Sequence, residues 1–213
     1  MKHSRFRSKT GLQNLVAASD REGIMIHDTP RGDLRARSRA DRLRPPLDRP
    51  LPAPLTIEIG AATGAGPTAM SAFDAALRDL GVGEANLIRL SSVIPPRATV
   101  ERIGRVRKPI PWGDRLYCVY AVRHAYGRGS TAAAGIGWAL RDDDSGAGLF
   151  VEHEAETSEE VAALIRASLA DMTRHRGGGF GPVQLCTVDA TSDGDPACAL
   201  VLAAYHTIPW GPR

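Results

Sequence analysis

The pattern of hydrophobic and polar positions divides the chain into an N-terminal part without periodicity and a longer part with strand-like and helix-like segments. Residues 55–59 alternate apolar and polar side chains, which is typical of a strand with one buried face. Residues 69–80 place apolar side chains three and four positions apart, and this spacing predicts an amphipathic helix. Gly81 follows, as glycine often does where a helix ends in a left-handed residue. The chain therefore predicts a strand, a loop with three glycines over residues 60–68, and a helix.

Further strand-like segments and one more helix follow this unit. Strands are expected over residues 86–90, 116–124, 131–140, 149–153, 184–190 and 197–206, the last two as a pair joined by a turn at 192–196. A helix is expected over residues 159–174, because Thr157 or Ser158 can cap it and acidic residues occupy its first turn. This order of elements predicts an α+β body in which helices pack on sheets.

The first 54 residues differ from the rest in composition. They hold 12 Lys and Arg against 6 Asp and Glu, a net charge of +6, and several prolines. Each proline removes a backbone donor and restricts the residue before it. We therefore expect a poorly ordered basic extension over residues 1–54 and one folded domain over residues 55–213. The extension lacks interleaved aromatic residues and any binding motif, so we expect no nucleic-acid partner.

Composition narrows the class of protein further. With 213 residues, of which 43% are hydrophobic, the chain can bury one core. It has neither a run of about 18 apolar residues nor an apolar signal segment at its start, so we expect no membrane association. The three cysteines, Cys118, Cys186 and Cys198, are an odd number without CxxC spacing. They indicate buried, reduced thiols in a cytoplasmic protein without a metal site.

The glycine-rich stretch Gly60–Gly66 lies between an expected strand and an expected helix, where a nucleotide phosphate can approach a helix N-terminus. Its spacing is neither GxGxxG nor GxxxxGK[ST], and no acidic residue for a ribose lies at the end of a strand about twenty residues later. A structural loop explains the stretch better, and a nucleotide-binding protein is kept as an alternative.

Two adjacent serines, Ser91 and Ser92, follow an expected strand and precede Pro95 and Pro96. On their own they would indicate a turn. Three stretches of the chain, however, resemble the pyruvoyl-dependent arginine decarboxylases, and the first of them resembles the self-cleavage segment of that family. The stretches are GVGEANLIRLSSVIPP at residues 81–96, MSAFDAAL at 70–77 and GLFVE at 148–152.

The resemblance implies that the chain cuts itself between Ser91 and Ser92 and that Ser92 becomes a covalent pyruvoyl group. A serine hydroxyl beside a strained peptide bond can attack the preceding carbonyl and turn the amide into an ester, provided that donors hold the oxyanion. Elimination and hydrolysis then leave a ketone at position 92 and two chains, residues 1–91 and 92–213. Such a ketone does what a bound carbonyl cofactor does elsewhere, so no pyridoxal phosphate is required.

The resemblance also implies a four-layer αββα sandwich and assigns roles to three further residues. Glu152 would donate the proton that quenches the carbanion, and an apolar strand is a suitable place to raise the pKa of such an acid. Asp74 would meet the guanidinium of the substrate, and Asn86 would orient the cleavage site or the bound substrate. Without the resemblance, each would be interpreted as an ordinary surface or strand-entry residue. His153 should face away from Glu152, because successive side chains on a strand alternate.

The resulting hypothesis is an enzyme that converts L-arginine to agmatine and carbon dioxide. The family implies a homo-oligomer, a trimer or a dimer of trimers, with sites between subunits and a small amino acid as substrate. Two alternatives stay open besides the nucleotide binder: the same pyruvoyl chemistry on another amino acid, and a nonenzymatic binding or regulatory protein that has kept the fold. The joint presence of Ser91, Ser92, Asn86, Asp74 and Glu152 speaks against the last.

Overall fold

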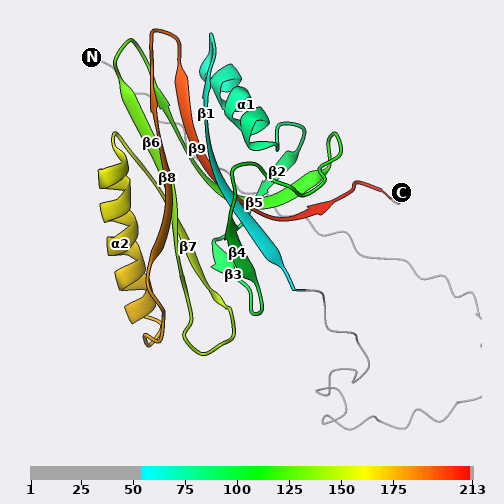
Figure 1. Cartoon of the computed structure of the whole chain (residues 1–213), viewed down its shortest axis with the longest axis vertical. Helices are drawn as coiled ribbons and strands as arrows, with labels where there is room; N and C mark the ends of the chain where they lie inside the picture. Colours follow the sequence, from blue (N-terminus) through cyan, green and yellow to red (C-terminus); the bar gives the residue numbers. More distant parts are fainter. Residues whose placement is uncertain (1–53, 212–213) are drawn as a thin grey trace, which may run out of the picture. The chain divides into compact units, whose positions relative to one another are not determined.

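The computed structural model describes residues 54–211, which form two sheets and two helices (Figure 1). The expected extension over residues 1–54 lies outside the described residues, apart from Pro54. The first sheet has five strands, in the order β2 (Asn86–Arg89), β5 (Arg115–Ala125), β9 (Ala197–Ile208), β1 (Thr56–Ala65) and β4 (Thr99–Arg102). The second has four, in the order β3 (Val93–Ile94), β7 (Gly148–Ala155), β6 (Thr131–Leu140) and β8 (Gln184–Thr191).

Each sheet carries one helix on its outer face. Helix α1 (Ala69–Leu80) packs on β1 and β9, and helix α2 (Ser158–Arg174) packs on β6, β7 and β8. Thr68 caps α1 by accepting a hydrogen bond from the Ser71 amide, and Gly81 ends it with φ 89°, a left-handed value that favours glycine. Thr157 caps α2. Both helices therefore begin and end close to where the sequence predicts.

The two sheets pack face to face around the main core, which includes Ile57, Ile136, Trp138 and Phe150. Strand β9 is apolar on both faces. Leu200 and its alternate residues face α1, whereas Val201 and its alternate residues face the other sheet. The layers thus follow the order α1, five-stranded sheet, four-stranded sheet, α2 (Figure 1). This arrangement confirms the α+β class and is consistent with the expected sandwich.

The glycine-rich stretch is a strand rather than the expected loop. β1 continues through Ala65, and a Cβ on Gly64 would lie 2.2 Å from the Ala72 carbonyl oxygen and 2.5 Å from the Ala76 nitrogen. A Cβ on Gly60 would lie 2.6 Å from the Leu80 Cδ1. The glycines therefore let α1 approach the sheet. This packing removes the reason for interpreting them as a phosphate-binding loop.

The expected pairing of the last two strands was wrong. β8 pairs with β6 in the four-stranded sheet, and β9 pairs with β1 and β5 in the other. The turn between them, with the Ser192 hydroxyl donating to the Asp195 carbonyl at 2.7 Å, carries the chain from one sheet to the other. A tight turn between two apolar segments indicates a hairpin, and the sequence alone does not distinguish it from a change of sheet. The short strands β3 and β4 were also missed.

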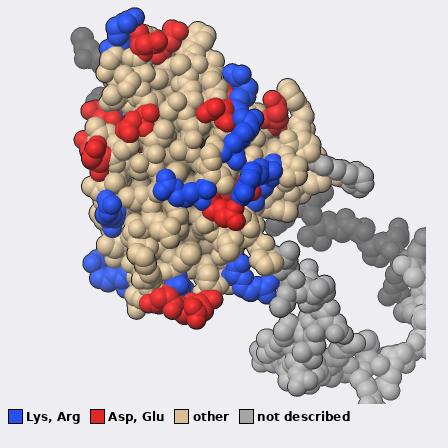
Figure 2. Space-filling view, in the orientation of Figure 1, with Lys and Arg blue, Asp and Glu red and all other residues tan. Residues whose placement is uncertain are grey.

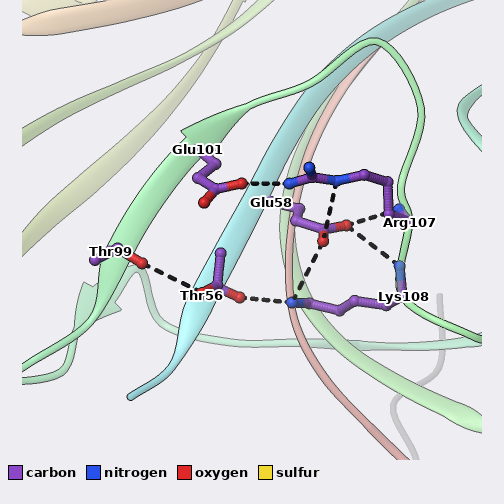
Figure 3. Close-up of polar contacts among 6 residues, drawn as sticks. All are labelled: Thr56, Glu58, Thr99, Glu101, Arg107 and Lys108. Carbon is purple, nitrogen blue, oxygen red and sulfur yellow. Dashed lines mark hydrogen bonds and ion pairs between the residues drawn. The ribbon is translucent and has the colours of Figure 1, made fainter.

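A buried carboxylate fixes the segment that follows the edge strand β4 (Figure 3). Glu58 on β1 is 6% exposed and accepts hydrogen bonds from the backbone amides of Arg107 at 2.8 Å and Lys108 at 3.4 Å. The Lys108 ammonium donates to the Thr56 carbonyl at 2.6 Å, and Arg107 also pairs with Glu101. These bonds satisfy a charge that would be costly if it were buried alone, and they hold the loop against β1.

Charge of both signs is spread over the face that Figure 2 shows, where Lys and Arg groups lie among Asp and Glu groups of the described residues. Within residues 54–211 no helix is both long and apolar enough to cross a membrane. The same residues contain no group of three or more His, Cys, Asp or Glu side chains arranged to hold a metal ion. Cys118, Cys186 and Cys198 are buried free thiols, as expected.

Candidate active site

The two serines lie where the chain crosses from one sheet to the other. β2 ends at Arg89, and the Leu90 amide still donates to the Cys118 carbonyl of the five-stranded sheet at 2.9 Å. Strand β3 of the four-stranded sheet begins at Val93. Ser91 and Ser92 span the gap, and Ser92 has φ 66°. A left-handed conformation costs a residue with a side chain about 1–2 kcal/mol, so the backbone is strained at Ser92, directly after the peptide bond where the resemblance predicts cleavage.

The Ser92 hydroxyl is hydrogen-bonded to Glu152. Its Oγ lies 2.7 Å from Oε1 and 2.9 Å from Oε2 of the carboxylate, which projects from β7. Both side chains are partly buried. A carboxylate within hydrogen-bond reach of a hydroxyl can accept its proton as the oxygen attacks, which is the arrangement of an activated nucleophile. The structure therefore joins two of the residues that the sequence predicts for this site.

The surroundings of Glu152 set its acidity. Burial raises the pKa of its carboxyl above the usual value, while the Ser92 hydroxyl bond and the Arg89 guanidinium oppose that rise. Arg89 is held in place because its guanidinium donates to the Tyr120 carbonyl at 3.1 Å and lies 4.9 Å from the centre of the Tyr120 ring. Sequence reasoning missed Arg89, although it lies only three residues before Ser92.

Backbone bonds hold the segment on the C-terminal side of Ser92. The Phe150 amide donates to the Ser92 carbonyl at 2.8 Å, and Val93 pairs with Leu149 of β7. The Tyr205 hydroxyl donates to the Val93 carbonyl at 3.1 Å. Sequence reasoning also missed Tyr205. The available signal was a tyrosine at the end of a long apolar run, since a buried phenol requires a hydrogen-bond partner.

Asn86 lies at the start of β2, at the opposite end of that strand from the serines. Its side-chain amide donates to the Gly113 carbonyl at 2.6 Å, and its backbone amide donates to the Asp114 carbonyl at 2.8 Å. These bonds attach the turn before β5 to β2. Within one chain, Asn86 is thus engaged with this turn, and its predicted part in orienting substrate stays a prediction.

Asp74 is on α1, with a side chain that is 55% exposed and accepts a hydrogen bond from Arg78 Nε at 2.8 Å. α1 covers the outer face of the five-stranded sheet, whereas Glu152 belongs to the four-stranded sheet. One copy of the chain therefore does not join Asp74 to the Ser92–Glu152 pair. His153 faces α2, where its Nε2 lies 2.8 Å from the Ser168 hydroxyl, and this confirms that it points away from Glu152.

Comparison with known proteins leads to one family. The sequence model of the family described as pyruvoyl-dependent arginine decarboxylase matches residues 56–208. The pyruvoyl-dependent arginine decarboxylase of Thermococcus kodakarensis is 36% identical over 145 residues, which are 68% of this chain and 90% of that protein. The protein of the same name from Halobacterium salinarum is 41% identical over 152 residues, 70% of this chain and 92% of that protein. The one from Pyrococcus abyssi is 35% identical over 141 residues, with shares of 66% and 87%.

Proposed function

The chain belongs to the pyruvoyl-dependent arginine decarboxylase family, and we propose that it converts L-arginine to agmatine and carbon dioxide after cutting itself between Ser91 and Ser92. As a member of this family it is a carboxy-lyase that works with a covalent pyruvoyl group. The observation that carries the proposal is the hydrogen bond from the Ser92 hydroxyl to the Glu152 carboxylate, at a residue with strained backbone.

Cleavage begins when Glu152 accepts the hydroxyl proton and Ser92 Oγ attacks the carbonyl carbon of Ser91. The C–N bond breaks, the nitrogen of residue 92 takes up the proton, and an ester replaces the amide. This shift proceeds through a five-membered ring, and it releases the left-handed constraint at Ser92. A base then removes the α-proton of residue 92, and Ser91 leaves as the carboxylate that ends the chain 1–91.

The remaining dehydroalanine at position 92 tautomerises and is hydrolysed by one water molecule. Ammonia departs, and the chain 92–213 begins with a ketone. The described residues fit this group, since the Phe150 amide already holds the carbonyl of residue 92 at 2.8 Å and the Glu152 carboxylate lies beside the Ser92 side chain, whose Cβ becomes the methyl group next to the ketone carbon. When present, the pyruvoyl ketone binds the α-amine of the substrate and accepts the electron pair left when carbon dioxide departs.

The side chains of this protein then bind the substrate and move one proton. Glu152 holds a proton beside position 92 and gives it to the α-carbon of the substrate after carbon dioxide has left. Asp74 binds the guanidinium of arginine, for which a carboxylate provides two parallel acceptors. In the single chain, Asp74 forms an ion pair with Arg78. An exposed ion pair of this kind contributes only about 0.2–1 kcal/mol, so the substrate guanidinium displaces Arg78 at little cost.

A homo-oligomer, a trimer or a dimer of trimers, completes the site by bringing Asp74 and Asn86 of one copy close to Ser92 of another. Two features of the single chain support this assembly. Asp74 and Ser92 lie on different layers of one copy, and the apolar side chain of Val93, next to Ser92, is 56% exposed. A second copy that covers Val93 would also exclude water from the ketone, which strengthens the electrostatic interactions there.

The test is carbon dioxide release by the purified full-length protein from arginine, ornithine, lysine and citrulline. Citrulline has the shape of arginine without its charge, so it isolates the contribution of the carboxylate. Arginine is expected to have the highest kcat/KM by at least tenfold. Equal turnover of citrulline and arginine would overturn the substrate assignment and leave the pyruvoyl chemistry intact.

A further inference from the structure

Tyr205 links the two sheets at the reactive segment. It belongs to β9 of the five-stranded sheet, and its side chain is 6% exposed in the core between the sheets. Its ring lies edge-on to Phe150, with 6.1 Å between the ring centres and 68° between their planes. Its hydroxyl crosses to the four-stranded sheet and donates to the Val93 carbonyl at 3.1 Å. A buried tyrosine thus donates its one hydrogen bond to the residue that follows Ser92.

The strand that receives this bond is short, with one exposed residue, Val93, and one residue buried in the core, Ile94. β3 has only two residues, and it is an edge strand that pairs with β7 through Val93 and Ile94. The Val93 side chain is 56% exposed, so its burial contributes little. The carbonyls of Ser92 and Val93 are each bonded, the first to the Phe150 amide at 2.8 Å and the second to Tyr205 at 3.1 Å. These two bonds fix the orientation of the peptide units on the C-terminal side of the strained serine.

Cleavage would increase the importance of the hydrogen bond from Tyr205 to the Val93 carbonyl. Once the bond between Ser91 and Ser92 is broken, residues 92–94 are the first residues of a chain, and chain ends fray unless they are attached to the fold. The Tyr205 hydroxyl then holds the second residue of the new chain, one peptide unit from the ketone. Reacting groups must keep their geometry to within a fraction of an ångström, so this attachment affects the chemistry as well as the fold.

We propose that Tyr205 is a positioning residue that fixes the backbone of residue 92 for self-cleavage and then holds the new N-terminus in the site. The proposal rests on the proposed function, since it assigns a residue to that same reaction. Burial, together with the charge of Glu152, raises the pKa of the Tyr205 hydroxyl, which therefore remains a donor over the whole range in which proteins work.

Tyr205→Phe tests the proposal because it removes the hydroxyl and keeps the ring. The matched control is Tyr117→Phe, which alters a tyrosine that packs against the same core from β5. Each full-length chain is made by cell-free synthesis, and cleavage is followed by intact mass. A neutral hydrogen bond of this kind corresponds to a change of roughly 3- to 10-fold, so Y205F is expected to cut that much more slowly than the parent and Y117F at the parent rate. For cut protein, kcat for arginine is expected to fall by a similar factor with KM unchanged.

Hydrogen exchange gives a second measurement, which separates a local loss of attachment at the new N-terminus from a loss of stability of the whole fold. In Y205F, peptides covering residues 92–98 are expected to exchange faster than in the parent, while peptides from α1 and α2 exchange at the parent rate. Hydrogen exchange is also compared between Ser92→Ala and Ser92→Ala/Tyr205→Phe, which are both uncut. This comparison tests whether Tyr205 holds residues 92–98 before any cleavage. An uncut parent would refute the proposed function alone, whereas parent-like exchange and cleavage in Y205F would overturn the role of Tyr205.

Discussion

The Ser92 hydroxyl donates to both oxygens of the Glu152 carboxylate, at 2.7 Å and 2.9 Å, although 60 residues separate them in sequence. Under the proposed function, this contact joins the nucleophile of self-cleavage to its base in the uncut chain. Cleavage would remove the hydroxyl, and with it a bond that lowers the pKa of Glu152. The pKa of this carboxyl would then rise as the ketone forms, and a residue that begins as a base would become better suited to act as an acid.

Glu152→Gln should slow both reactions, because an amide can neither accept the Ser92 proton nor return one to substrate. General acid or base catalysis contributes about 10²–10⁴-fold, so cleavage followed by intact mass should slow by at least about 100-fold, as should carbon dioxide release per cut chain. In the parent, cleavage should also slow as the pH falls through the pKa of Glu152, where the base becomes protonated. Glu154→Gln, two residues along the same strand, is the matched control and should retain the parent rates.

Glu152 should also destabilise the folded chain at neutral pH. Burial raises its folded pKa above the unfolded value, so its ionised form is disfavoured by folding. The penalty is absent below the unfolded pKa of about 4.3 and develops as the pH rises through the folded pKa. The measurement compares the melting temperatures of Ser92→Ala and Ser92→Ala/Glu152→Gln, which are both uncut. The double variant should melt higher at pH 7 than the single variant, with a smaller difference at pH 5, and a gap independent of pH would contradict this prediction.

Asp74→Asn should lower kcat/KM for arginine and leave the rate of self-cleavage unchanged. Hydrogen bonds to a charged group contribute about 1.5–3 kcal/mol, which corresponds to roughly 10- to 100-fold in kcat/KM for arginine. Turnover of citrulline should change much less, because citrulline lacks the positive charge. Asp79→Asn, on the same helix, provides the control. The guanidinium role would be excluded by an Asp74→Asn variant that uses arginine as well as the parent does.

Gly64→Ala should destabilise the fold, since its Cβ would lie 2.2 Å from the Ala72 carbonyl oxygen in the backbone of α1. Overpacking of this kind costs about 1–3 kcal/mol, which lowers the melting temperature of a domain this size by roughly 2–12 °C. Gly104→Ala is the control, because nothing lies within 4 Å of a Cβ at that position. Equal melting temperatures for the two variants would show that β1 and α1 are not packed as described.

Much of the fold follows from local patterns in the sequence. The bounds of α1 and β6 were predicted to the residue, because a helical apolar pattern that ends at a glycine and a continuous run of small apolar residues are local signals. The change of sheet between β8 and β9 was not predicted, since it depends on which strands pair far along the chain. β3 was missed because its two residues are too few to show a pattern.

The candidate site was predicted unevenly for the same reason. Ser92 and Glu152 were named through resemblance, and the alternation of a strand separated Glu152 from His153. Tyr205 makes its contact across the two sheets, and Arg89 is held by Tyr120 of the neighbouring strand, and neither contact leaves a local pattern in the sequence. Asp74 and Asn86 were named as well, but a single copy does not bring them to Ser92, so their predicted roles would require a second copy of the chain.

The most direct test of the whole account is the intact mass of the purified protein before and after treatment with borohydride. Two fragments are expected, residues 1–91 and residues 92–213, the second beginning with a ketone and gaining two hydrogens on reduction. Ser92→Ala should give one uncut chain, while Ser91→Ala should still cut, because Ser91 contributes only its backbone carbonyl. A single uncut parent chain with an unmodified serine at position 92, unchanged by borohydride, would contradict the account.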